Sequence, residues 1–243
     1  MRRSNVAAVL CALLLLSVAS AGCTVSLPSG GGQSNSSTSS SSKTPASTGV
    51  GSTHMLALEE LDVNSYGGAV SDVNVSIEPG AGYVFVATKP LTGSDFQETA
   101  QTAADVAAAR AHVDLSRQDV KFVVHVPEKV DAVDGPSAGL PMAIAVYSAI
   151  TKTPTNKYVY GTGTIESDGR VNRVGGVYWK ALAAAESGAK VIIVPSNETA
   201  VNTTNPLATS GGVNLQSELR KNGYNVTVVG VKNIDEAIPY YFS

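Results

Sequence analysis

The sequence predicts an α+β fold. Strand-like and helix-like segments both occur, they do not follow the strict strand–helix alternation of a parallel α/β protein, and no internal repeat is visible. The 189 residues from Met55 to Ser243 carry this mixed pattern. A chain of that length can bury one hydrophobic core, so a single folded domain is expected there.

The first half of this domain is predicted to hold three strands and two helices. The strands are expected at Ala69–Pro79, Gly82–Thr88 and Asp119–Pro127. The turn PGAG joins the first two. An Ala-rich run with few breakers predicts a helix from Ser94 to Val113, capped by Ser94 or Asp95. The almost wholly apolar segment Ser137–Ile150 predicts a buried helix.

The second half is predicted to hold four strands and two helices. Its strands are expected at Lys157–Ser167, Arg170–Val174, Ala189–Pro195 and Asn225–Val231. Its helices are expected at Val177–Ser187 and Leu215–Gly223. The dipeptide Asp168–Gly169 predicts a turn between the first two of these strands.

The N-terminus resembles an export signal. Two arginines precede the apolar run Val6–Ala21, which is shorter than the roughly 20 residues that a membrane span needs. The run ends in SAGC, which is similar to a lipobox whose Cys23 would carry a lipid anchor. Cleavage after the ASA of Ala19–Ala21 and an uncleaved signal anchor are the alternatives. All three predict that the rest of the chain lies outside the cytoplasm.

A linker is expected between this segment and the domain. From Thr24 to Thr53 the chain is almost entirely Ser, Thr, Gly and Pro, and such a composition offers too few apolar side chains to offset the entropy of ordering. The chain is therefore divided into a signal or anchor segment at 1–23, a disordered linker at 24–54 and a folded domain at 55–243. Five N-x-[ST] sequons are weak candidates for glycosylation, at Asn35, Asn74, Asn197, Asn202 and Asn225.

Composition excludes several classes of function. The net charge of −3 and the scattered Lys and Arg residues give no footprint for nucleic acid. The two cysteines, Cys11 and Cys23, both precede the domain, so no disulfide or Cys-based site is expected inside it. The three histidines have no metal-ligand spacing, and neither a metal nor another cofactor is predicted.

Ser137, in the stretch VDGPSAGLPM, is the first candidate for chemistry. It precedes a predicted buried helix, whose free N–H groups and positive dipole end favour a developing oxyanion. Gly135 and Gly139 would let a substrate carbonyl approach the backbone, and Pro136 stiffens the turn. The alternative is that Ser137 is an ordinary helix N-cap.

Lys180 is the candidate base for such a serine. It lies among apolar residues in GGVYWKALAAAESG, and burial would lower its pKa toward neutrality because the ammonium form loses its solvation. The alternative is a lysine that extends its charged end into water. Neither residue alone decides between the two interpretations.

Taken together, HVPEKVDAVDGPSAG and TGTIESDGRVNRVGGVYWKALAAAESGAKVIIVP resemble the proteolytic domain of Lon proteases, which use a Ser–Lys dyad. The family pattern is H-V-P-E, D-G-P-S-A-G, T-G-E and V-G-G-x-x-x-K. The resemblance covers the chain from about Met55 to Ser243 and assigns the dyad to Ser137 and Lys180, which lie 43 positions apart, as in the family. It also matches Asp134 and Thr162 to family positions.

The chain departs from the family pattern at two positions. Thr164 stands where the family has the Glu of T-G-E, and Val123 stands where many members have a His. The sequence also contains no G-x-x-x-x-G-K-[ST], so no ATPase module and no use of ATP are expected.

The resemblance implies an ATP-independent serine endopeptidase. Its substrates would be unfolded or flexible polypeptides, and a membrane anchor would hold it outside the cytoplasm. Lys180 would act as the base for Ser137. Backbone N–H groups around Gly135 to Ala138 would surround the oxyanion, with Asp134 and Thr162 in supporting roles. Family members usually form rings, and the sequence leaves open whether this chain does. It likewise does not define a cleavage preference.

Two other functions are compatible with the sequence. A non-catalytic surface module could use the same fold to grip extended peptides along a strand edge. A structural component of the cell envelope would depend only on the linker and the sequons, and would leave Lys180 exposed and far from Ser137.

Overall fold

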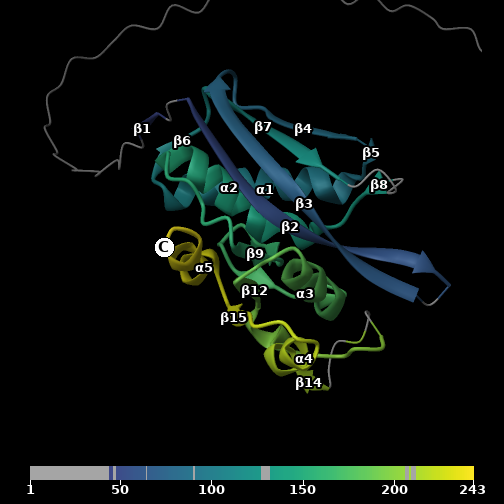
Figure 1. Cartoon of the computed structure of the whole chain (residues 1–243). Helices are drawn as coiled ribbons and strands as arrows, with labels where there is room; N and C mark the ends of the chain where they lie inside the picture. The colour runs from purple at the N-terminus through teal and green to yellow at the C-terminus, as the bar shows by residue number, and fades with distance from the viewer. Residues whose placement is uncertain are drawn as a thin grey trace, which may run out of the picture. The chain divides into compact units, whose positions relative to one another are not determined.

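The structure is a computed structural model, which describes residues 44–45, 48–63, 65–89, 91–126, 132–205, 208 and 212–243 (Figure 1). The chain divides into two compact units, 1–41 and 42–243, and the described residues belong to the second. The predicted signal segment and Cys23 lie outside them. No helix in the described ranges is long and apolar enough to cross a membrane.

A seven-stranded mixed sheet organises the second unit. The strands follow one another across the sheet in the order β15 (Thr227–Val231), β12 (Val191–Pro195), β9 (Val159–Gly161), β2 (Gly49–Asp62), β3 (Ser65–Pro79), β7 (Gln118–His125) and β4 (Val84–Lys89). Neighbours are parallel except at β2–β3 and β3–β7, which are antiparallel. This mixture of directions, with helices packed on the sheet, confirms the predicted α+β fold.

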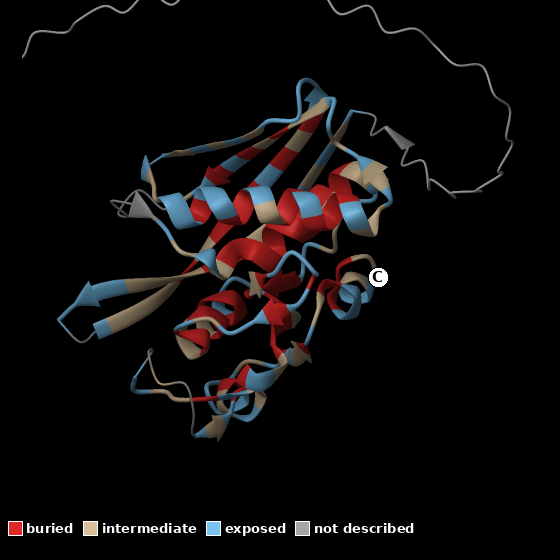
Figure 2. Cartoon of the chain, turned by 180° about the vertical axis from the view of Figure 1, so that it is seen from behind, coloured by how far each residue is buried: buried red, intermediate tan, exposed pale blue. Residues whose placement is uncertain are grey.

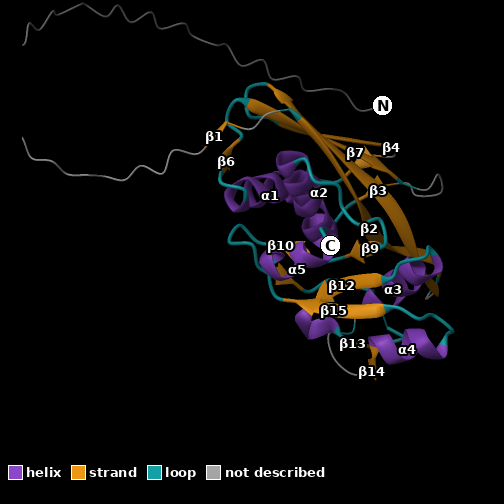
Figure 3. Ribbon diagram, turned by 60° about the vertical axis from the view of Figure 1, so that its left-hand side comes forward, coloured by secondary structure: helices purple, strands orange, loops and turns teal. Residues whose placement is uncertain are grey.

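Five α-helices of the described residues cover the sheet. They are α1 (Ser94–Arg110), α2 (Gly139–Thr151), α3 (Val177–Glu186), α4 (Leu215–Lys221) and α5 (Ile234–Tyr241). Figure 3 shows α1 and α2 packed together beside β2, β3 and β7. Ten of the residues of α2 are buried, as its apolar sequence predicts (Figure 2).

The side chains of β12 separate two hydrophobic clusters. Ile193 belongs to the larger cluster, which also contains most of the buried residues of α1 and α2. Ile192 and Val194 belong to the smaller cluster, around α3 and α4. Because successive strand residues face opposite sides of a sheet, this half of the sheet is covered on both faces.

Four two-stranded ladders complete the described secondary structure. They pair β1 (Thr44–Pro45) with β6 (Val113–Asp114), β5 (Leu91–Thr92) with β8 (Ala132–Val133), β10 (Thr164–Ile165) with β11 (Val171–Asn172), and β13 (Ala200–Val201) with β14 (Val213–Asn214). The β10–β11 pair is antiparallel across the predicted Asp168–Gly169 turn. One long strand predicted over Lys157–Ser167 is instead divided into β9 and β10.

The sheet begins before the predicted domain boundary. β2 starts at Gly49, six residues ahead of Met55. Gly49 and Gly51 resemble linker residues in the sequence, but both lie against α2, where a methyl group would overlap the carbonyl oxygens of Ala149 and Ala145. These glycines are therefore needed for the close approach of a strand to a helix.

The cap of α1 also differs from the prediction. Its N-cap residue is Gly93, and neither Ser94 nor Asp95 caps the helix. The carboxylate of Asp134, from the loop after β8, accepts a hydrogen bond of 3.2 Å from the N–H of Phe96. A residue distant in the sequence thus accepts a hydrogen bond from a free N–H group in the first turn of α1. Local sequence patterns cannot reveal such a partner.

Candidate active site

Ser137 and Lys180 line the same cavity. Its volume is about 380 Å³, and it lies between the middle of the β2–β3 hairpin, the turn before α2 and the start of α3. Most of its wall is apolar, from Met55, Ala57, Leu58, Ala69, Val126, Pro136 and Val174. The two candidates of the sequence-based dyad therefore open onto one space.

A tight turn presents Ser137. Gly135 has φ +94°, a backbone conformation that glycine adopts readily, and the 3₁₀ turn Pro136–Ala138 follows and leads into α2. The N-cap of α2 is Ala138, and no side chain caps either the 3₁₀ turn or α2. Ser137 is half-buried and is not a helix cap, so its hydroxyl is not committed to that structural role.

The break between β9 and β10 holds this turn in place. The carbonyl oxygen of Ser137 accepts hydrogen bonds from the N–H of Gly163, at 3.0 Å, and from the hydroxyl of Thr162, at 3.2 Å. In return, the N–H of Leu140 donates to the carbonyl of Gly163 at 3.0 Å. This exchange explains why the predicted strand Lys157–Ser167 is interrupted: the N–H of Thr162 still donates to the Ile193 carbonyl of β12, but both backbone groups of Gly163 bond to the turn.

Lys180 is buried in the first turns of α3. The exposed fraction of the residue is 3%. Its backbone N–H donates to the carbonyl of Gly176, the N-cap residue of α3, which has φ +68°. Burial lowers the pKa of Lys180 to about 8, and the nearby Glu198 opposes that fall. No carboxylate of the described residues lies within ion-pair distance of the amine. Lys180 does not extend into water, and near pH 8 a substantial fraction carries a free amine.

The supporting residues have defined places. Asp134, Gly135 and Pro136 line the cavity, while Ala138 is buried behind them. Asp134 positions the turn by its bond to α1. Thr162 is fully buried, and its hydroxyl donates to the Ser137 carbonyl. His125, which is bonded to Asn74 at 3.4 Å, does not line the cavity.

No sequence motif points to Glu198. This residue lies after β12 in a 3₁₀ turn (Ser196–Glu198), and its exposed fraction is only 6%. Its carboxylate accepts a 2.9 Å hydrogen bond from the N–H of Val174 and lies 3.6 Å from Nε of Arg173. Both partners belong to the cavity wall. The sequence separation of 24 residues from Val174 explains why spacing alone did not single it out.

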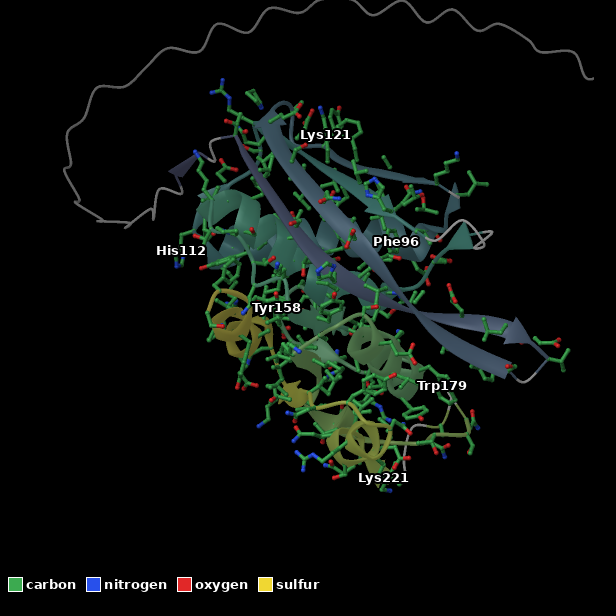
Figure 4. The ribbon with its side chains drawn as sticks, viewed as in Figure 1. Phe96, His112, Lys121, Tyr158, Trp179 and Lys221 are labelled. Atoms are coloured by element: carbon green, nitrogen blue, oxygen red, sulfur yellow. The ribbon has the colours of Figure 1, made fainter. Side chains whose placement is uncertain are left out.

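The apolar wall also carries charged and polar groups. Glu59 and Arg173 line the cavity with Asp134, and Thr164, at the position of the family's Glu, has a buried hydroxyl without a hydrogen-bond partner in the described structure. Trp179 lies beside Lys180 on α3 (Figure 4). Its ring packs edge-on against that of Tyr66 on β3, with centroids 5.9 Å apart. No cluster of three or more His, Cys, Asp or Glu residues in the described ranges could hold a metal ion.

Comparison with known proteins identifies one family. The sequence model of the Lon protease (S16) C-terminal proteolytic domain matches residues 40–218. The match extends across β2 and into the residues that precede the predicted boundary at Met55, as the fold does.

Individual relatives agree with the family match. Lon protease of Clostridioides difficile is 37% identical over 135 residues, which is 53% of this chain and 17% of that protein. Lon protease of Xanthomonas oryzae pv. oryzae is 36% identical over 135 residues, 53% of this chain and 15% of that protein. Lon protease 2 of Herpetosiphon aurantiacus is 33% identical over 186 residues, 74% of this chain and 21% of that protein. The matched region is thus about a fifth or less of each relative's length.

Proposed function

Because the chain belongs to the family of Lon protease (S16) C-terminal proteolytic domains, we propose that it is a serine endopeptidase that works through Ser137 and Lys180. The observation that carries this proposal is the cavity onto which both residues open, with Lys180 buried and its pKa lowered to about 8. A serine nucleophile needs a base that is unprotonated near the working pH, and a buried lysine supplies one.

The reaction begins with a proton transfer. The free amine of Lys180 takes the proton of the Ser137 hydroxyl as Oγ attacks the scissile carbonyl, and the resulting ammonium then protonates the leaving amine. Water hydrolyses the acyl-enzyme in a second, similar step. Backbone N–H groups between Gly135 and Ala138 hold the oxyanion, because those of Gly139 and Leu140 already donate to the carbonyls of Pro136 and Gly163.

The setting of the enzyme is part of the proposal. The apolar run Val6–Ala21 and Cys23 support an exported protein held at the outer face of the cytoplasmic membrane, with 24–41 as its tether. The sequence lacks G-x-x-x-x-G-K-[ST], which supports cleavage without ATP. Cleavage without ATP would suit substrates that are already unfolded or flexible polypeptides. Assembly into a homo-oligomeric ring is compatible with this activity.

The proposal is tested by turnover of the full chain without ATP. An unfolded casein-like substrate and a fluorogenic peptide are incubated with the parent, Ser137→Ala, Lys180→Met and the control Lys190→Met, whose lysine is exposed. Activity should fall by about 10²–10⁴-fold or more in the first two variants and persist in the control. The parent's activity should rise with pH around an apparent pKa of about 8.

Two outcomes contradict the proposal. Equal cleavage by all four proteins would mean that a contaminant is responsible. A parent that binds unfolded polypeptide as tightly as Ser137→Ala does, yet never cleaves it, would favour the non-catalytic peptide-binding module.

A further inference from the structure

Glu198 is a buried acid next to the candidate base. Its exposed fraction is 6% and that of Lys180 is 3%, and the two are close enough for their charges to interact although they form no ion pair. A carboxylate is rarely buried without a partner or a function, because losing its hydration is costly. The dyad as proposed makes no use of this acid.

The partners of Glu198 place it against the cavity wall. One carboxylate oxygen accepts from the N–H of Val174 at 2.9 Å, and the other lies 3.6 Å from Nε of Arg173. These two residues connect β11 to the Gly175–Gly176 turn that starts α3. Glu198 therefore ties the segment that precedes Lys180 to the end of β12.

We infer that Glu198 is a positioning residue for Lys180: its carboxylate fixes the Arg173–Val174 wall and stabilises the ammonium that forms on Lys180. This inference rests on the proposed function. When the Oγ–H bond of Ser137 breaks and an N–H bond forms at Nζ of Lys180, a positive charge appears in a buried site. A fixed carboxylate nearby lowers the energy of that charge, as the buried acid of a serine-protease triad does for its histidine.

Other charged groups around the cavity are less suited to this role. Glu59 on β2, Asp134 before α2 and Arg173 after β11 also line the cavity, but Glu198 is the charge that acts on the pKa of Lys180. Burial raises the pKa of Glu198, while the Val174 N–H, Arg173 and Lys180 oppose the rise and favour the carboxylate. Asp134 is exposed and bonded to the start of α1.

The test is a titration of Lys180 itself. The ¹³Cε chemical shift of Lys180 is followed from pH 6 to 11 in the lysine-labelled full chain, with Lys180→Met to assign the signal. Glu198→Gln removes the charge but keeps an oxygen that can accept from Val174. We expect the pKa of Lys180 to fall by on the order of one unit in this variant, since it loses an attractive charge. Glu186→Gln, an exposed acid on the same helix, should leave it unchanged.

Turnover gives a second readout. In Glu198→Gln the acid limb of the kcat/KM profile should move to lower pH with the Lys180 pKa. The kcat at high pH, where the amine is free in both proteins, should fall by up to about tenfold because a weaker base accepts the proton. Glu198→Asp should restore part of both effects.

The outcomes separate the two proposals. An unchanged Lys180 pKa in Glu198→Gln, with only a lower melting temperature, would make Glu198 purely structural and overturn the inference. The titration needs no turnover. A chain without peptidase activity would therefore contradict the proposed function, whereas the effect of Glu198→Gln on the pKa of Lys180 would still test the role of Glu198.

Discussion

Lys180 is held where its ordinary charged form is poorly solvated. Its pKa of about 8 lies below the usual 10.5, so at neutral pH the folded protein keeps a buried ammonium at a cost in free energy. A buried lysine of this kind lowers the stability of the fold but supplies a reactive amine, a combination that is common at functional sites.

This cost predicts a pH-dependent stability. Below pH 8 both folded and unfolded states bind the Lys180 proton, so the penalty is constant. From pH 8 to 10.5 the unfolded state binds more protons, and the free energy of unfolding of the parent should rise by about 3 kcal/mol relative to Lys180→Met. Chemical denaturation of both proteins at several pH values measures the difference. If the free energies of unfolding of the two proteins changed in parallel with pH, Lys180 would not be a destabilised ammonium buried in the folded state.

At this scale the sequence reveals the proposed reacting residues better than their neighbours. Ser137 and Lys180 stand in motifs whose spacing is visible in one dimension. Glu198 and Asp134 act through backbone N–H groups of Val174 and Phe96, 24 and 38 positions away. Hydrogen bonds from a side chain to a distant backbone leave no local pattern, because any residue except proline can offer the N–H.

At the scale of elements, the packing of β2 on α2 depends on two residues without side chains. The helix backbone passes so near the strand that a methyl group at Gly49 or Gly51 would overlap a carbonyl oxygen. The obstacle is backbone, which cannot move aside as a flexible side chain can. This contact positions α2, whose first turn follows Ser137.

Gly51→Ala should therefore destabilise the fold. Overpacking costs typically about 1–3 kcal/mol, and a rigid obstacle favours the upper part of that range. Ser52→Ala is the matched control, because the next side chain points to the exposed face and its loss should change stability by less than about 0.5 kcal/mol. The two unfolding free energies, measured by denaturant titration, should differ clearly. Equal values would mean that β2 does not lie directly on α2.

The helices α1 to α4 were predictable from the sequence, whereas α5 and the strand pairing were not. The apolar run of α2 and the Ala-rich run of α1 predict their positions within a few residues. The turn PGAG suggests that β3 and β4 are neighbours, but β7 lies between them. The carboxylate of Asp119 on β7 accepts from the N–H groups of Ala81 and Tyr83, at 2.8 and 3.0 Å, and so holds the turn over that strand.

At the scale of the whole molecule, the linker and the domain share a composition where they meet. Residues 49–54 read GVGSTH, which contains one large aliphatic side chain, and that side chain, Val50, is 76% exposed. A boundary drawn from hydrophobicity falls after them. The structure includes them because each pairs with β3, from Gly49 opposite Ile77 to His54 opposite Asp72. Backbone pairing needs no apolar sequence, so composition could not locate the start of the fold.

The position of β2 predicts how the chain tolerates shortening. A chain that begins at Ser42 retains the whole compact unit, whereas one that begins at Met55 loses six residue pairs of a central strand and uncovers part of α2. Each lost hydrogen bond contributes about 1 kcal/mol, so the deletion removes several kcal/mol from a domain whose total stability is typically about 5–15 kcal/mol. We expect the Ser42 chain to melt near the temperature of the full chain, and the Met55 chain to melt well below it or to aggregate. Thermal unfolding followed by circular dichroism compares the three. If the Met55 chain unfolded at the same temperature as the Ser42 chain, residues 49–54 would be dispensable, and the fold would begin where the hydrophobic pattern does.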